Sequence, residues 1–425
     1  MPPRSDELPR MVRVRQDLYS APLAEKDVVV AAKKAVADLL VAQKLTPGAS
    51  VAVGAGSRGI DNYALIVRTV VEELIAAGMQ PFVFPAMGSH GGATAEGQRQ
   101  VLQSLGINEQ SLGCPIRATM EVVTLGETAS GQPVYLDQFA SEADGIVVVN
   151  RIKQHTNFRA PVESGLMKML AIGAGKDRQA SAIHRHGVPG LVNHMPQVAR
   201  VVLEKSPVLG GIGILEDGHH RTARVVGVPA ETMEPTEIAL LDETRHWQPK
   251  LPVKELDLLI VDRIGKNISG TGMDPNVIGR CRLPDFPAFP EPVIRAITIH
   301  DITDESHGNG VGVGLADVVT PAVADKFNAK MTYINSLTAG SPAKAAMPPV
   351  AETDYDAVRT AIDYLLPLKP MSQQRVIRIR DTLNLEQMLV SQAVAAELAD
   401  SSKVTIDGEF RDLAFDTDGK LASIW

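Results

Sequence analysis

Residues 150–187 read NRIKQHTNFRAPVESGLMKMLAIGAGKDRQASAIHRHG, and they follow the apolar run Ile146–Val149, IVVV. A short, fully apolar run of this kind predicts a buried parallel strand that ends where the quoted stretch begins. In α/β proteins, ligands bind outside the carboxyl ends of such strands. The stretch therefore predicts a mostly parallel sheet with a functional site just beyond this strand.

Lys168 is the only charged residue in the segment GLMKMLAIG, residues 165–173. A lysine enclosed by apolar groups has its pKa lowered by desolvation and becomes a usable nucleophile. The alternative is a lysine whose aliphatic stem lies along apolar surface while its ammonium group reaches water. Composition alone leaves both interpretations open.

Two earlier segments repeat the order strand, glycine-rich loop, helix. Residues 50–53 and 81–85 are predicted strands, and the loops that follow them carry Arg58 and His90. The repeat predicts parallel strands with right-handed crossovers, so the loops should meet at one edge of the sheet. We therefore expect Arg58 and His90 to lie near Lys168 and the loop that carries His155.

The loop after residue 53 contains the pattern GxGxxG at Gly54, Gly56 and Gly59. On its own this pattern is weak evidence for a dinucleotide site. Backbone N–H groups and the guanidinium of Arg58 would suit an anion equally well. An ordinary surface arginine after a tight turn is the other interpretation.

Composition excludes several classes of protein. The chain has 425 residues and a net charge of −8, and it shows no basic face, so nucleic acid is not an expected partner. Cys114 and Cys281 lack CxxC or metal-ligand spacing, which fits a reducing compartment. The N-terminus lacks a signal-peptide pattern and no apolar run reaches 18 residues, so we expect a cytoplasmic protein with no membrane partner.

A second α/β unit is expected after a boundary near residue 250, which divides the chain into domains 1–250 and 251–425. Its first strand, residues 255–261, precedes a loop rich in Gly, Ser, Thr and Asn, residues 263–274, which favours a binding loop. A structured loop is the better interpretation of the acidic segment 301–310, because it lacks the spacing of an EF-hand.

His90 and His155 both follow predicted strands, and two histidines facing one pocket suit reversible proton transfer near neutral pH. His184 lies sixteen residues after Lys168 and would need a turn at Gly173 or Gly175 to return to the same pocket. Each histidine alone is more often an ordinary hydrogen-bonded residue. Their joint placement beside Lys168 favours function.

The sequence resembles the lactate racemase family, whose enzymes use a nickel-pincer nucleotide, a pyridinium thioamide/thiocarboxylate mononucleotide that holds Ni. The resemblance implies an N-terminal α/β domain and a smaller α/β domain that closes over it, with the active site in the cleft between them. It spans most of the chain and rests on the motifs MGSH (87–90), NRIKQHT (150–156), Lys168 with His184, GKNISGTGMDPN (265–276) and DITDESHGNG (301–310).

Carried over by position, the resemblance implies that Lys168 is joined to the cofactor and that His184 is the protein ligand to nickel. Sulfur and imidazole donors in a planar arrangement are typical of nickel. His90 and His155 would be the paired acid and base. The substrate carboxylate would be held by Arg58, with Lys266 or Asn267 from the second domain as a further contact.

The implied reaction inverts C2 of a 2-hydroxy acid. One histidine takes the hydroxyl proton while hydride moves from carbon to the cofactor, and hydride then returns to the other face of the planar keto acid. The implied partners are the substrate and the enzymes that make the cofactor. Better-known members carry an aspartate where this chain has Ala55. The expected substrate is therefore lactate, malate or another 2-hydroxy acid. If the substrate has a second carboxylate, it could be bound by Lys153, Arg159 or Arg185.

Two interpretations from other classes remain. One is a zinc-dependent hydrolase or lyase with His90, His155 and His184 as ligands, which gives Lys168 no role. The other is a non-catalytic protein that binds a nucleotide cofactor through its two glycine-rich loops. A Lys168→Ala substitution separates these from the racemase, because only the racemase requires that lysine to hold its cofactor.

Overall fold

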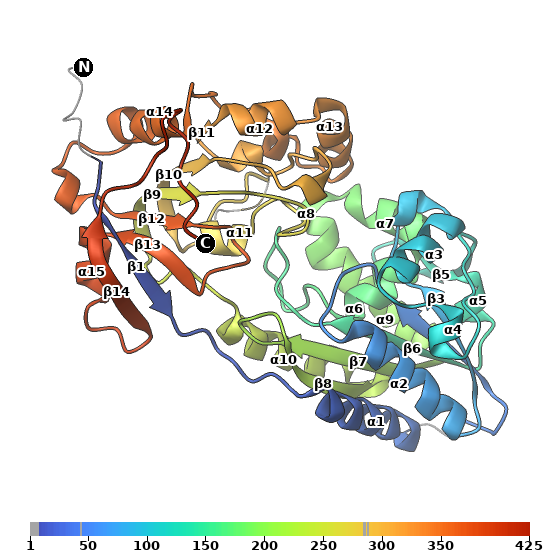
Figure 1. Cartoon of the computed structure of the whole chain (residues 1–425). Helices are drawn as coiled ribbons and strands as arrows, with labels where there is room; N and C mark the ends of the chain where they lie inside the picture. The colour runs from blue at the N-terminus through green and yellow to red at the C-terminus, as the bar shows by residue number, and fades with distance from the viewer. Residues whose placement is uncertain (1–7, 43–44, 284–285, 287–288) are drawn as a thin grey trace. The chain divides into compact units, whose positions relative to one another are not determined.

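The computed structural model describes residues 8–42, 45–283, 286 and 289–425. Its chain divides into two compact α/β units, Tyr19–Gln248 and Pro249–Trp425, with the residues up to Leu18 added to the latter (Figure 1). The first strand, β1 (Met11–Gln16), pairs with strands near the C-terminus. The placement of residues 1–250 in one domain is therefore wrong for β1, because local sequence does not reveal which sheet edge a strand joins.

The unit of residues 19–248 is built on a five-stranded sheet. Its strand order is β3 (Gln80–Pro85), β2 (Ser50–Ala55), β6 (Gly145–Arg151), β7 (Val208–Glu216), β8 (Thr222–Pro229). The first four strands are parallel, and β8 pairs antiparallel with β7 at the edge. The predicted mostly parallel α/β sheet is confirmed. A separate hairpin pairs β4 (Val122–Glu127) with β5 (Pro133–Asp137).

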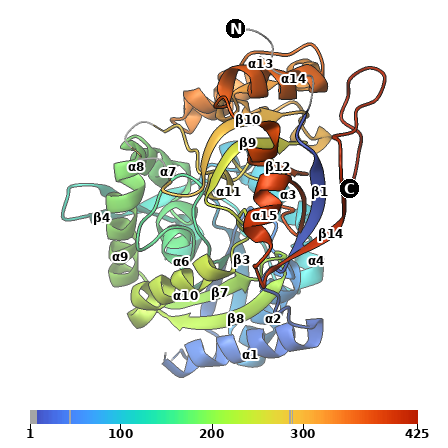
Figure 2. The ribbon, with the colours of Figure 1, turned by 90° about the vertical axis from the view of Figure 1, so that its left-hand side faces the viewer.

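Helices cover both faces of this sheet. Figure 2 shows α1 (Glu25–Ala42) and α2 (Tyr63–Ala76) on one side of β7 and β8, with α10 (Met233–Trp247) on the other. The apolar residues of α2 recur three and four positions apart, so they form one buried stripe. The other helices of this unit are α3 (Ala95–Ser104), α4 (Glu109–Leu112), α5 (Gln138–Ser141), α6 (Leu166–Lys168), α7 (Lys176–His184), α8 (Gly187–Pro189) and α9 (Met195–Lys205).

The segment after β6 folds as an interrupted helix. Helix α6 continues as a π-helical turn, Met169–Gly173, and α7 then begins after Gly175. Gly173 is needed because a Cβ there would lie 2.6 Å from the carbonyl oxygen of Ala86. The chain therefore turns where the sequence suggested, and α7 brings His184 back toward Lys168.

The second unit contains a seven-stranded mixed sheet. Its order is β11 (Val318–Val319), β10 (Val293–Ile299), β9 (Glu255–Val261), β12 (Val376–Ile379), β13 (Gln387–Ser391), β1, β14 (Val404–Arg411). Strands β11, β10, β9 and β12 are parallel, and the remaining pairs are antiparallel. Its helices are α11 (Pro275–Ile278), α12 (Pro321–Lys326), α13 (Ala329–Thr338), α14 (Asp354–Thr360) and α15 (Gln392–Leu398). No helix in the described part of the chain has the length and apolar composition to cross a bilayer.

Candidate active site

Hydrogen bonds join the three loops at the carboxyl ends of β2, β3 and β6. The buried hydroxyl of Tyr63 accepts from Gly56 N (2.6 Å) and donates to Val149 O (2.9 Å), which ties the loop after β2 to the end of β6. Gly88 N donates to Gly173 O (3.1 Å), which ties the loop after β3 to the lysine segment. The predicted convergence of these loops is confirmed.

A Tyr63→Phe variant is expected to unfold at lower urea, because it leaves a buried N–H without its hydroxyl partner and a carbonyl without its donor. Such losses cost about 1–3 kcal/mol. The measurement is urea unfolding followed by Trp247 fluorescence in a Trp425→Phe background, so that only the unit of residues 19–248 reports. Tyr364→Phe is the matched control, since Tyr364 is 76% exposed and lies in the other unit. Equal unfolding midpoints for the two variants would contradict the role of the Tyr63 hydroxyl.

Lys168 interacts electrostatically with Arg58 and with His184. Desolvation lowers its pKa to about 8, helped by the positive charge of Arg58 and opposed by Glu163. The pKa of Arg58 is lowered by desolvation and by Arg151. Although His184 is exposed, the protein around its ring and then the charge of Lys168 lower its pKa to about 4. At neutral pH, His184 is therefore an uncharged imidazole that can act as a metal ligand.

Arg58, Lys168 and His184 are also unpaired. Within the described residues, none of the three side chains has a hydrogen bond or an ion pair to another protein group. Lys168 is half-buried, and such a cation usually has partners because desolvation without compensation is costly, whereas the side chains of Arg58 and His184 are exposed. The structure thus brings three of the predicted residues together and leaves their nitrogen atoms available for a ligand.

His90 lies on the exposed loop after β3. Its Nδ1 lies 2.5 Å from the Ser57 hydroxyl, so it contacts the residue next to Arg58. Gln98 donates to the carbonyls of Gly88 (2.8 Å) and His90 (3.3 Å) and fixes the backbone of this loop. The structure therefore places His90 beside the Arg58 loop, as the sheet order predicts.

His155 lies on the loop after β6, and its ring packs against Phe158 with the ring centroids 4.4 Å apart and the planes tilted by 32°. Its backbone N–H donates to Glu163 Oε2 (2.7 Å), and its Nδ1 accepts from Asn157 N (3.1 Å). Because Nδ1 accepts, the neutral ring carries its proton on Nε2. Arg159 donates to His155 O (2.7 Å) and to Glu163 (3.3 Å), so its guanidinium stabilises this loop.

Sequence reasoning missed a fully buried lysine, Lys176. Its ammonium donates to Pro85 O (2.5 Å) and Gln98 Oε1 (3.1 Å), and it pairs with Asp137 at 3.0 Å. Through Gln98 it supports the His90 loop. The available signal was a second charge close to the apolar segment that surrounds Lys168, but nothing in the sequence identified its partners.

Lys266 and Asn267 belong to the other unit, in the loop after β9. Lys266 Nζ donates to Gly270 O (2.7 Å), and Asn267 accepts from the Thr303 hydroxyl (2.7 Å). Their contact with substrate stays a prediction. In the acidic segment 301–310, Asp301 and Asp304 pair with Lys326.

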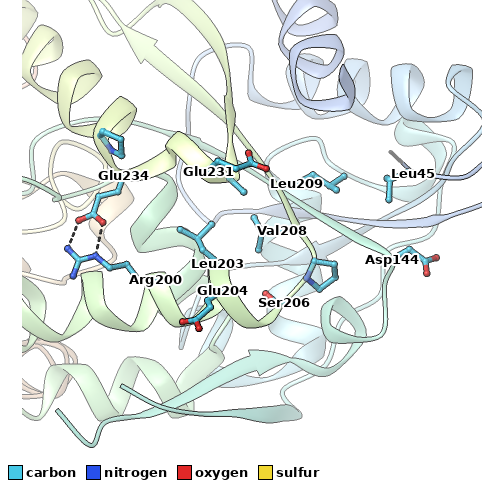
Figure 3. Close-up of a pocket in the computed structure, with 13 residues that line it drawn as sticks. Leu45, Asp144, Arg200, Leu203, Glu204, Ser206, Val208, Leu209, Glu231 and Glu234 are labelled. Atoms are coloured by element: carbon cyan, nitrogen blue, oxygen red, sulfur yellow. Dashed lines mark hydrogen bonds and ion pairs between the residues drawn. The ribbon is translucent and has the colours of Figure 1, made fainter. Parts of the chain in front are cut away.

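Two features of the described residues bear on other functions: the absence of a group of zinc ligands and a hollow away from the predicted site residues. No group of three His, Cys, Asp or Glu side chains lies close enough there to hold a metal, so His90, His155 and His184 do not form the triad of the zinc interpretation. A hollow of about 590 Å³ lies at the opposite edge of the sheet, where β7 begins. Figure 3 shows the side chains that line it, with Arg200 and Glu234 paired at its rim. The hollow contains none of the predicted site residues.

Comparison with known proteins finds similarity to one family and to solved structures. Residues 31–189 match the family described as the lactate racemase N-terminal domain. No curated protein matches the chain significantly. Similar solved structures include a Thermotoga maritima protein (14% identity, 77% of this chain, 83% of that chain, TM-score 0.46). Another is the lactate racemase apoprotein of Thermoanaerobacterium thermosaccharolyticum (12% identity, 87% and 84%, TM-score 0.45).

The matched segment carries Arg58, His90, His155, Lys168 and His184, all on the loops and helices just described. The fold is that of an α/β protein, and its predicted lysine and histidine residues lie on loops and helices beyond its parallel strands. Its N-terminal segment, residues 31–189, is similar to the lactate racemase N-terminal domain family.

Proposed function

We propose that this protein is a racemase or epimerase that inverts the C2 centre of a 2-hydroxy acid with a nickel-pincer nucleotide held by Lys168. The observation that carries the proposal is the unpaired group of Arg58, Lys168 and His184 within the segment that matches the racemase family. A non-catalytic carrier would need neither an activated amine nor loop histidines beside it.

The residues present fit the cofactor. An amine with a pKa of about 8 is partly unprotonated near neutral pH and is suited to a covalent thioamide link. A neutral imidazole at His184 supplies a nitrogen ligand of the type that nickel accepts alongside sulfur. When bound, the cofactor supplies a reversible acceptor for the hydrogen at C2.

The chain's own residues would then bind the substrate and move its hydroxyl proton. The guanidinium of Arg58 offers a bidentate contact to the substrate carboxylate. His90 and His155 would act as base and acid in turn, each for one enantiomer. The basic lone pair of a neutral His155 ring protonated on Nε2 lies on Nδ1, which accepts from Asn157 N, so that hydrogen bond would have to open before the ring takes the substrate's proton. Lys266 and Asn267 would contribute a further anion contact from the second unit.

The test is intact mass and metal analysis of protein co-expressed with the enzymes that make the cofactor. We expect a mass increment that maps to the Lys168 peptide, nearly stoichiometric nickel, and racemisation of at least one 2-hydroxy acid. Lys168→Ala should lose all three. The surface variant Lys205→Ala is the matched control and should retain them.

His184→Ala refines the test, because it should lose nickel while the mass increment at Lys168 remains. A folded wild-type protein with neither increment nor nickel would overturn the proposal. An increment without racemisation of any 2-hydroxy acid would favour the carrier interpretation instead.

A further inference from the structure

Helix α10 contacts both segments that carry the predicted centre. Glu237 lies near its first turns and is completely buried. Its Oε2 accepts from Met167 N (2.9 Å), whereas its buried Oε1 has no hydrogen-bond partner among the described residues. Met167 lies in the helical turn that ends at Lys168. A buried carboxylate from α10 therefore anchors the turn that presents the lysine.

Gly165 shows how closely this carboxylate packs. A Cβ at position 165 would lie 2.6 Å from the carboxyl carbon of Glu237, so a larger residue there would force that carboxyl group to move. Desolvation raises the pKa of Glu237 to about 7, which shows that the group is held out of water despite its cost. The hydrogen bond that this buried carboxyl group accepts helps to make the surrounding structure rigid.

Arg245 makes the second contact, two turns further along α10. Its Nη2 donates to Glu163 Oε1 (2.8 Å) and to Ala160 O (3.0 Å). The other oxygen of Glu163 accepts the His155 N–H, and Glu163 also raises the pKa of Lys168. Glu163 is itself completely buried. A chain of direct contacts thus runs from α10 through Glu163 to the loop of His155.

We propose that α10 is a brace that fixes the His155 loop relative to the Lys168 turn, with Glu237 and Arg245 as positioning residues. The two residues are eight positions apart, which spans about 12 Å of helix. Helix α10 contacts the Lys168 turn through Glu237 and the His155 loop through Arg245, so its rigidity fixes the distance between the two segments. The importance of these positions to catalysis rests on the proposed function, but the brace itself does not.

The test measures the environment of Lys168 in the cofactor-free protein, so it is independent of nickel loading. Trace labelling with acetic anhydride across pH 6–11, read by mass spectrometry of Lys168-containing peptides, gives the pKa of its amine. Glu237→Ala and Arg245→Met should each let water reach the amine and raise its pKa by about one unit. Labelling at pH 8 should then fall about five-fold, as follows from the lower fraction of free amine.

Conservative variants and a matched control separate positioning from general damage. Glu237→Gln and Arg245→Lys keep an acceptor and a donor in place, so they should retain most of the wild-type labelling profile. Glu234→Gln, on the same helix, removes the ion pair with Arg200 and a small electrostatic effect on Glu237 but no hydrogen bond to the Lys168 turn, so it should leave the profile nearly unchanged. Folded Glu237→Ala and Arg245→Met proteins with wild-type profiles would overturn the proposal.

A measurement on the wild-type protein covers the case in which these variants fail to fold. Hydrogen exchange should show the amides of Met167 and His155 protected at least 100-fold more than a typical solvent-exposed loop amide, because each donates to a buried carboxylate. Exchange of these amides at unprotected rates would refute the brace without any substitution.

Discussion

His155→Asn and His90→Asn, each loaded with cofactor, are expected to lower kcat for racemisation by about 10²–10⁴-fold. The reason is that inversion in both directions needs a base on each face of the substrate. Each variant should therefore keep the first half-reaction with one enantiomer only. The structure supports separate roles, because His90 contacts the loop of Arg58 whereas His155 lies on the loop held by Glu163.

The measurement is single-turnover formation of the 2-keto acid from each enantiomer, alongside steady-state racemisation. One variant should form keto acid from the D-enantiomer only and the other from the L-enantiomer only. His246→Asn is the control, because His246 is an exposed residue at the end of α10. If both variants lose the same enantiomer, the two-base assignment is wrong.

The convergence of the site loops could be predicted because its signals are local. Short apolar runs followed by glycines mark strand ends, and parallel strands present those ends at one edge. This is enough to bring the loops of Arg58 and His90 to the segment of Lys168. The return of His184 was predictable as well, because Gly173 and Gly175 mark the turn between two helical segments.

The supporting contacts could not be predicted because they join residues far apart in sequence. Arg245 and Glu163 are separated by 82 positions, and Glu237 and Met167 by 70. The sequence does not distinguish a buried charged residue from an exposed one. The ion-pair or hydrogen-bond partner of such a residue is determined only when the helices and strands pack together. The same reason explains β1, whose alternating pattern predicts a strand but not the sheet that it joins.

Lys176→Met is expected to be the most destabilising of the substitutions considered. The side chains are similar in volume, and both residues would have to adopt the left-handed backbone conformation at φ 57°. The main change is therefore the loss of the ammonium group, which leaves the buried carboxylate of Asp137 without its 3.0 Å partner. Removing one member of a buried ion pair costs about 3–5 kcal/mol.

A double-mutant cycle tests this explanation. Burial raises the pKa of Asp137 and lowers that of Lys176, so both groups tolerate neutral replacement better together than singly. Asp137→Asn keeps the acceptor for Ala140 N, and in combination with Lys176→Met it should recover part of the lost stability. The measurement is urea unfolding followed by Trp247 fluorescence in the Trp425→Phe background, with Lys34→Met as the control from an exposed pair.

The same variant also bears on the site, because Lys176 contacts Gln98, and Gln98 holds the carbonyls of Gly88 and His90. Loss of the ammonium should loosen the His90 loop before the sheet unfolds. Hydrogen exchange of peptides covering residues 86–93 should rise in Lys176→Met under native conditions, whereas peptides from β7 should not change. Equal increases in both segments would mean that Lys176 supports the whole unit and has no particular effect on His90.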